Sequence, residues 1–154
     1  MRPIIVISSR LASTRLPGKP LADIHGKAMI VHVLERALAA DLGPVVVACA
    51  EPEIAAAVAA AGGRAILTRP DHPSGSDRIW EALGQADPAG RHDVVVNVQG
   101  DLPTIPPADI RAALAPLAEP AVEIATLAAV IHRAEERGNP NVVKVAAALG
   151  PERR

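Results

Sequence analysis

Short apolar runs and helical patterns alternate along the chain. Apolar runs rich in β-branched side chains predict buried strands at residues 3–7, 45–47, 65–67 and 94–98. The segments between and after them, periodic or Ala-rich, predict helices at residues 29–40, 52–61, 77–85 and 108–117. Two later apolar runs predict further strands at residues 124–130 and 142–145. Ser76 or Asp77 is expected to cap the third helix.

Strands that are separated by helices and are apolar on both faces are typical of an α/β protein with a doubly wound, mostly parallel sheet. The 154 residues suffice for one core, so we expect a single domain over residues 1–154. In such sheets, ligands bind beyond the carboxyl ends of the strands. The loops that follow residues 3–7 and 94–98 are therefore the first places to look for a site.

Composition and charge exclude several classes of partner. Trp80 is the sole aromatic residue, and the net charge is −1, so neither base stacking nor a positive field favours a nucleic-acid partner. No apolar stretch reaches the length of a membrane span, and the first residues lack the pattern of a signal peptide. We therefore expect a cytoplasmic protein without a membrane partner. Cys49 has no second cysteine to pair with and is expected to be buried and inert.

The loop after the first strand has the composition of a phosphate-binding loop. From Ser8 to Lys19 it holds three cations, three Ser, one Thr, one Gly and no acid. Cations neutralise a triphosphate, hydroxyl and amide groups donate hydrogen bonds to it, and a Gly permits close approach. The spacing of a P-loop is absent. A solvated basic loop is the alternative, and the residues alone favour neither.

Two further segments carry candidate chemistry. Asp101 follows a Gly at the end of the strand at 94–98, where a carboxylate can hold Mg²⁺ together with substrate phosphates. The alternative is a simple turn before a proline. In the other segment, Ser74 and Gly75 can donate hydrogen bonds to a base or ribose, and Arg78 can reach a base carbonyl. The alternative there is merely a well-capped helix start.

Several motifs together resemble the 3-deoxy-manno-octulosonate cytidylyltransferases in order and spacing. They are residues 13–21, 23–27, 29–37, 72–78, 97–101 and 139–145, so the resemblance covers essentially the whole chain. The first motif is shared with other sugar-nucleotide transferases, including acylneuraminate cytidylyltransferases. The combination of Ser-Gly-Ser-Asp-Arg at 74–78 with Val-Gln-Gly-Asp at 98–101 narrows the resemblance to the enzymes of 3-deoxy-manno-octulosonate (Kdo).

The resemblance implies a Rossmann-like nucleotidyltransferase fold of the glycosyltransferase-A type. It implies Mg²⁺-dependent transfer of CMP from CTP to Kdo, with release of pyrophosphate, by a homodimer in lipopolysaccharide biosynthesis. Arg10, Lys19 and Asp101 would be catalytic, with Asp101 also binding the metal. These three would also bind substrate, together with Ser8, Ser9, Arg15, Ser74, Gly75, Arg78 and Gln99.

The chain also departs from the family pattern. Ser8-Ser9 stands where Pro-Ala is usual, Cys49-Ala50 replaces Thr-Asp, and Leu102 replaces a Glu. Relatives continue with a sugar-handling, dimer-forming segment that supplies a second metal-binding acid. We therefore expect this chain to be truncated and to transfer CMP poorly. The alternatives are a catalytically impaired CTP-binding remnant and a related transferase, like the acylneuraminate enzymes, that uses another sugar.

Overall fold

The computed structural model describes residues 1–12 and 17–145, and its centre is a parallel sheet. The four strands lie in the order β5-β4-β1-β6. They are β1 (Pro3–Ser9), β4 (Val45–Cys49), β5 (Arg64–Leu67) and β6 (Val94–Gln99). Each neighbouring pair is parallel. These strands include every residue of the first four predicted runs, so the mostly parallel α/β sheet is confirmed.

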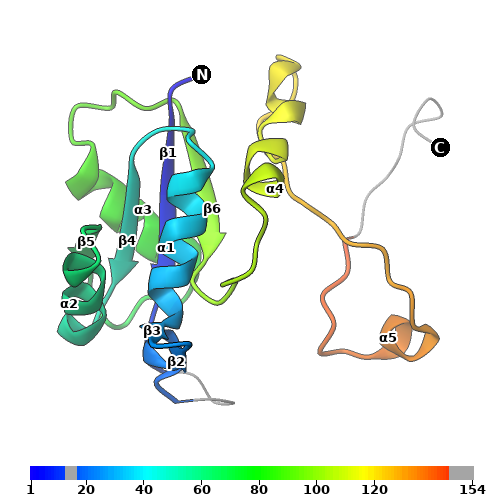
Figure 1. Cartoon of the computed structure of the whole chain (residues 1–154). Helices are drawn as coiled ribbons and strands as arrows, with labels where there is room; N and C mark the ends of the chain where they lie inside the picture. Colours follow the sequence, from blue (N-terminus) through cyan, green and yellow to red (C-terminus); the bar gives the residue numbers. More distant parts are fainter. Residues whose placement is uncertain (13–16, 146–154) are drawn as a thin grey trace.

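Helices cover both faces of the sheet (Figure 1). Helices α1 (Met29–Ala39) and α2 (Pro52–Ala60) pack on one face, and α3 (Gly75–Ala86) packs on the other. The alternating side chains of β1 divide accordingly: Ile5 and Ile7 join the core under α1, whereas Ile4 and Val6 join the core under α3. Burial on both faces explains why β1 has a continuous apolar sequence.

Two helix ends differ from the sequence prediction. The cap of α3 is Ser74, whose hydroxyl accepts a hydrogen bond from the backbone N–H of Asp77 at 3.2 Å. Ser74 has extended backbone, and the helix already begins at Gly75, so the predicted caps lie inside it. The helix expected at 108–117 is shorter, with α4 at Pro107–Ala112 followed by a 3-10 turn, η2 (Ala115–Ala118). Pro116 cannot donate the backbone hydrogen bond that an α-helix needs there.

Three small elements before α1 were not predicted. Strands β2 (Asp23–Ile24) and β3 (Lys27–Ala28) form an antiparallel hairpin before α1. A 3-10 turn, η1 (Lys19–Leu21), precedes them. They are too short to give a periodic pattern. No helix of the described residues has the length and apolar character that a membrane span requires.

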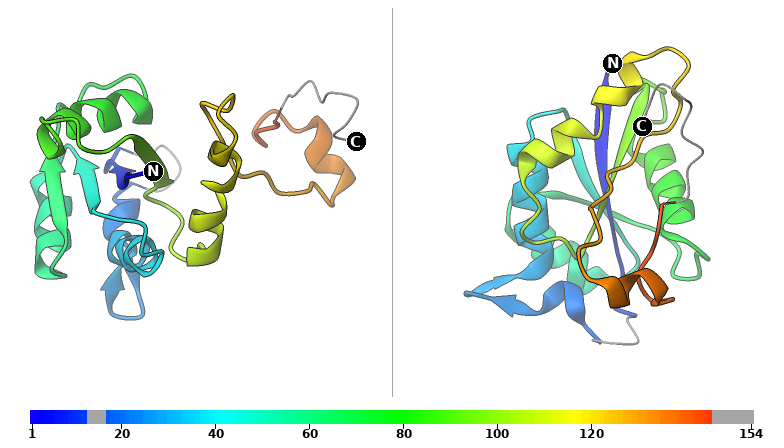
Figure 2. Two further views of the ribbon diagram at one scale, coloured as in Figure 1. Left: turned by 90° about the horizontal axis from the view of Figure 1, so that it is seen from above. Right: turned by 90° about the vertical axis from the view of Figure 1, so that its right-hand side faces the viewer.

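The strands predicted at 124–130 and 142–145 are wrong. The described residues after Glu119 contain the short helix α5 (Ala134–Gly138) and otherwise neither helix nor strand. This segment runs away from the sheet (Figures 1 and 2). Ile124 and Val143 are 88% and 93% exposed. An apolar run forms a strand only where a free sheet edge pairs with it and another layer covers it. No described element does either here.

Candidate active site

A cavity of about 310 Å³ lies where the carboxyl ends of β1 and β6 meet the N-terminus of α3. It is at the edge of the sheet where a doubly wound fold is expected to bind ligands. Most of the residues predicted for the site line it: Ser8, Ser9, Arg10, Lys19, Ser74, Gly75, Arg78, Gln99 and Asp101. Arg15, the remaining predicted residue, lies outside the described residues.

Gly100 fixes the end of β6 against β1. Its backbone N–H donates to the carbonyl oxygen of Ser8 at 3.1 Å, which extends the contact between the two strands. A Cβ atom at this position would lie 2.6 Å from that same oxygen. Only glycine permits so close an approach without a shift of the backbone. The next residue, Asp101, is thereby placed at the mouth of the cavity.

Lys19 and Asp101 form an ion pair beside the cavity. The Nζ of Lys19 lies 2.6 Å from Oδ2 of Asp101, although 82 residues separate them. The side chains remain 34% and 50% exposed, so water and ligands can reach both. Lys19, which was predicted to bind phosphate, thus neutralises Asp101, which was predicted to bind metal. A polyphosphate can compete for Lys19 and release the carboxylate for a cation.

The hydroxyl and amide groups of the strand ends surround this pair. The hydroxyl of Ser9 is buried, lines the cavity, and has no hydrogen-bond partner among the described residues. The side-chain amide of Gln99 donates to the side-chain oxygen Oδ1 of Asn97 at 3.3 Å, which orients it at the rim. Such groups suit a ligand with many oxygen atoms.

Glu51 anchors the start of the basic loop, and sequence reasoning missed it. Its Oε1 accepts a hydrogen bond from the backbone N–H of Leu11 at 2.9 Å. The N–H of Gly18 donates to the carbonyl of Leu11 at 3.3 Å and closes the loop. The sequence offered one indication of this role, because Glu51 comes soon after β4 and therefore at the same edge of the sheet as the loop. Glu51 therefore keeps an acid in the region where Cys49-Ala50 replaces the usual Thr-Asp.

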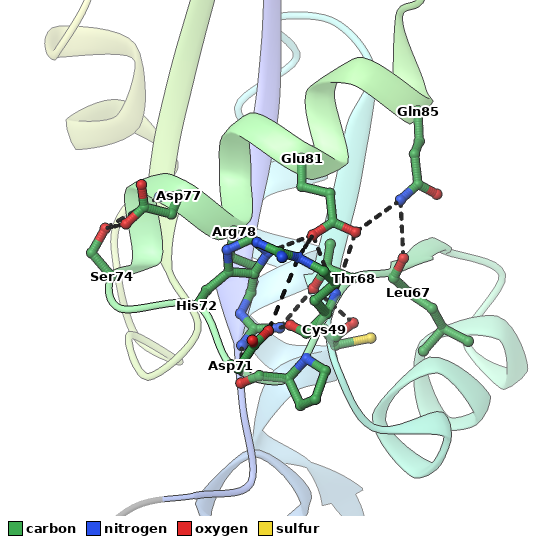
Figure 3. Close-up of polar contacts among 12 residues, drawn as sticks. Cys49, Leu67, Thr68, Asp71, His72, Ser74, Asp77, Arg78, Glu81 and Gln85 are labelled. Atoms are coloured by element: carbon green, nitrogen blue, oxygen red, sulfur yellow. Dashed lines mark hydrogen bonds and ion pairs between the residues drawn. The ribbon is translucent and has the colours of Figure 1, made fainter.

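Arg78 builds the cavity wall, which differs from the expectation that it reaches toward a base. It is 3% exposed, and Nη1 donates to the hydroxyl of Thr68 at 2.6 Å and to the carbonyl of Arg69 at 3.2 Å. Its Nη2 donates to the carbonyl of Pro70 at 3.5 Å. Figure 3 shows the guanidinium of Arg78 turned toward the loop at residues 68–70. A buried guanidinium so engaged holds the loop against α3.

A second pair in the wall joins His72 to Glu81 on α3 (Figure 3). The Nε2 of His72 lies 2.5 Å from Oε2 of Glu81, and the imidazole is 5% exposed. This hydrogen bond lowers the pKa of Glu81. His72 belongs to a motif that the sequence singled out, but neither residue was predicted to act in the site.

The described residues offer no cluster of three or more His, Cys, Asp or Glu side chains that could hold a metal by themselves. A metal at Asp101 would therefore need further ligands from outside the described residues. Cys49 at the end of β4 is fully buried, and burial raises the pKa of its thiol to about 11. The prediction of a buried, unreactive thiol agrees with this placement.

Comparison with known proteins agrees with the sequence motifs. The cytidylyltransferase family model matches residues 4–149. The chain is 68% identical, over 97% of its length, to the 3-deoxy-manno-octulosonate cytidylyltransferase of Rhodospirillum centenum, and it covers 58% of that relative. It is 62% identical, over its full length, to the enzyme of that name from Paramagnetospirillum magneticum, and it covers 63% of that protein. The chain thus spans less than two thirds of these relatives.

Solved structures confirm the nucleotidyltransferase fold. A CMP:2-keto-3-deoxy-manno-octonic acid synthetase complexed with CTP superposes with a TM-score of 0.73 at 45% identity, over 79% of this chain and 50% of that one. A nucleotidyl transferase from Methanothermobacter, at 20% identity and a TM-score of 0.61, shares the fold over 72% of this chain and 56% of its own. Because the family model covers nearly the whole chain and the central sheet is shared with these structures, the chain belongs to the cytidylyltransferase family.

Proposed function

We propose that this chain is the nucleotide-binding part of a 3-deoxy-manno-octulosonate cytidylyltransferase. The reaction transfers CMP from CTP to Kdo, releases pyrophosphate, and serves lipopolysaccharide biosynthesis. The observation that carries the proposal is the meeting of Lys19 and Asp101 at the cavity, 2.6 Å apart. A cation for phosphates beside an acid for a metal is the combination that a nucleotidyl transfer requires.

The residues of this chain would act mainly by positioning and by neutralising charge. The anomeric oxygen of the sugar bonds to the α-phosphorus in line, its proton passes to solvent water, and the bond from that phosphorus to the departing pyrophosphate breaks. Arg10 and Lys19 would bind the leaving phosphates; each cation contributes on the order of 4 kcal/mol at about 4 Å and surface-like dielectric, before desolvation. Ser9 and Gln99 would donate hydrogen bonds to the nucleotide.

Asp101 fits a magnesium ion that arrives with the nucleotide. Mg²⁺ takes few protein carboxylates and fills its other positions with phosphate oxygens and water. Asp101 supplies one half-exposed carboxylate at the cavity mouth, next to the proposed phosphate-binding cation. When bound, Mg²⁺ supplies further charge neutralisation to the phosphates. We expect Asp101→Asn to weaken the Mg²⁺ dependence of CTP binding, measured by calorimetry with and without the metal, whereas an unchanged dependence would remove Asp101 from the metal site.

Three further features of the family belong to the same proposal. We expect residues 1–154 to fold as one nucleotide-binding unit, the intact enzyme to be a homodimer, and the reaction to take place in the cytoplasm. The similarity of the described sheet to that of the synthetase complexed with CTP supports the first of these.

The test of function is Kdo-dependent release of pyrophosphate from CTP by the purified chain with Mg²⁺. A thermal-shift panel of nucleoside triphosphates should accompany it. At a hundred times its dissociation constant, Mg-CTP should raise the free energy of unfolding by about 2.7 kcal/mol, more than Mg-ATP does. Equal shifts of the melting temperature with ATP and CTP would contradict the proposed preference for cytidine. CTP binding without transfer would identify a nucleotide-binding remnant, and transfer to another acid sugar alone would replace Kdo as the substrate.

A further inference from the structure

His72 is a buried side chain in the cavity wall for which the proposed reaction has no role so far. We propose that Nδ1 of His72 accepts a hydrogen bond from the exocyclic amine of a bound cytosine. Glu81 would be the positioning residue that orients the imidazole. This inference rests on the proposed function, because it names the group that reads the base of the nucleotide.

The hydrogen bonds of His72 define which ring nitrogen is available. Nε2 lies 2.5 Å from a carboxylate oxygen of Glu81. An ionised carboxylate only accepts hydrogen bonds, so Nε2 carries the proton, and in the neutral ring Nδ1 is a bare acceptor. This Nδ1 is buried and has no hydrogen-bond partner among the described residues, so a donor reaches it only when the side chains around it move. Buried acceptors without partners are rare because they cost free energy, which suggests that a ligand supplies the donor.

Glu81 is itself held in place, so the imidazole is fixed (Figure 3). Its two carboxylate oxygens accept hydrogen bonds from the backbone N–H of Arg69 at 3.3 and 3.2 Å, and the Gln85 amide donates to one of them at 3.5 Å. The hydrogen bond from His72 lowers the pKa of Glu81, which keeps the carboxylate ionised. Arg78 holds the same loop from within through Thr68. A side chain on so rigid a support is well suited to recognition.

The chemistry of His72 favours the base over the phosphates, because a phosphate group has no N–H to donate to an acceptor. His72 lines the cavity together with Arg10, Lys19, Ser74 and Gly75. Cytosine presents an amine where uracil presents a carbonyl oxygen. An acceptor at this place would therefore bind cytosine and repel uracil.

The test compares two amide variants of His72 whose side chains differ in length by one methylene. In His72→Gln the side-chain amide can reach the position of Nε2 and keep the contact with Glu81, but nothing replaces Nδ1. In His72→Asn the amide is near the position of Nδ1, and its carbonyl can still accept from the base. Trp80→Ala is the control, since Trp80 lies on the same helix with 77% of its surface exposed. Dissociation constants are measured for Mg-CTP, Mg-UTP and inorganic triphosphate, with thermal melting to confirm folding.

We expect His72→Gln to lower CTP affinity about tenfold, the equivalent of one hydrogen bond, and to bring CTP and UTP to similar affinities. Triphosphate affinity should be unchanged, and His72→Asn should retain part of the preference for CTP. Glu81→Gln should show the same loss to a smaller degree, because it loosens the ring without removing Nδ1. Trp80→Ala should behave like the parent.

Each contrary result has a distinct meaning. If the parent prefers CTP and His72→Gln keeps that preference, this inference fails while the proposed function stands. If His72→Gln weakens CTP and UTP equally, the ring does not read the base, and the inference also fails. An equal loss of inorganic triphosphate affinity would reduce His72 to a structural role. A parent chain that binds CTP and UTP alike would overturn both the inference and the cytidine preference on which it rests.

Discussion

Replacing Gly100 by Ala should damage the site and the fold together. The added Cβ would lie 2.6 Å from the carbonyl oxygen of Ser8 and 3.2 Å from Cβ of Ser9. Strand β1 cannot retreat, because it pairs with β4 on one side and with β6 on the other. Overpacking of this kind costs about 1–3 kcal/mol, or a fall in melting temperature of roughly 2–12 °C for a chain of this size.

The same shift would move Asp101, the next residue. Misplacement of a reacting group by about 1 Å can cost roughly 10²-fold in rate, so Kdo-dependent pyrophosphate release should fall by that order if the chain is active. Binding of Mg-CTP, followed by calorimetry, should weaken as well. Thermal melting monitored by circular dichroism gives the stability change independently of activity.

Gly84→Ala is the matched control for this substitution. Gly84 lies inside α3, and a Cβ there would meet no described atom within 4 Å. An Ala in place of a helical Gly should stabilise by roughly 0.5–1 kcal/mol. The two variants exchange the same residue types, yet their stability changes should have opposite signs. If Gly100→Ala melts like the parent and binds Mg-CTP as tightly, the close contact between β6 and β1 does not fix Asp101, and the reasoning fails.

Three further predictions concern single side chains. Lys19→Ala should lower CTP affinity by about 10- to 100-fold while CMP affinity changes little, and calorimetry showing equal losses would contradict its role at the outer phosphates. The backbone N–H groups of Arg91 and His92 donate hydrogen bonds to Asp87 and hold its pKa well below its usual range. Asp87 therefore stabilises the fold at pH values above its ordinary pKa of 3.8, and this stabilisation is lost as the pH falls toward the lowered pKa. In Asp87→Asn the free energy of unfolding, measured by denaturant titration, should therefore fall less on acidification than in the parent. An unchanged pH dependence would refute this. Cys49, with a pKa of about 11, should react with a disulfide reagent at pH 8 only as fast as the chain opens, and rapid labelling of folded protein would show that it is accessible.

The parallel sheet was predictable because each of its buried strands can be recognised from its own residues. Strands β1 and β4 are buried almost throughout, and such strands leave uninterrupted apolar runs in the sequence. The apolar runs at 124–130 and 142–145 have a similar composition but no strand structure. Composition reports how strongly a segment favours burial, whereas a strand also needs a free edge and a covering layer. Those depend on the rest of the fold, so the later strands could not be judged from their own residues.

That the predicted residues gather at one cavity was predictable, whereas the contacts they make there were less so. Parallel strands bring their carboxyl ends together, so residues after β1 and β6 had to meet. Which polar groups pair is decided by side-chain directions and by distant segments. Arg78 turns inward to Thr68, and Glu51 binds a backbone N–H 40 residues away. The bond between His72 and Glu81 depends on the loop folding back along α3, which no spacing rule foretells.

The pairing of Lys19 with Asp101 bears on the order in which ligands bind, given the proposed function. In the free chain the phosphate-binding cation and the metal-binding acid neutralise one another at 2.6 Å. Exposed pairs contribute only about 0.2–1 kcal/mol, so little free energy is lost when this one opens. Free Mg²⁺ would leave Lys19 without a partner, and a metal-free triphosphate would leave Asp101 facing negative charge. The complex of Mg²⁺ with the nucleotide replaces both partners in one step, so the pair favours binding of the complex over either component alone by at most about 1 kcal/mol.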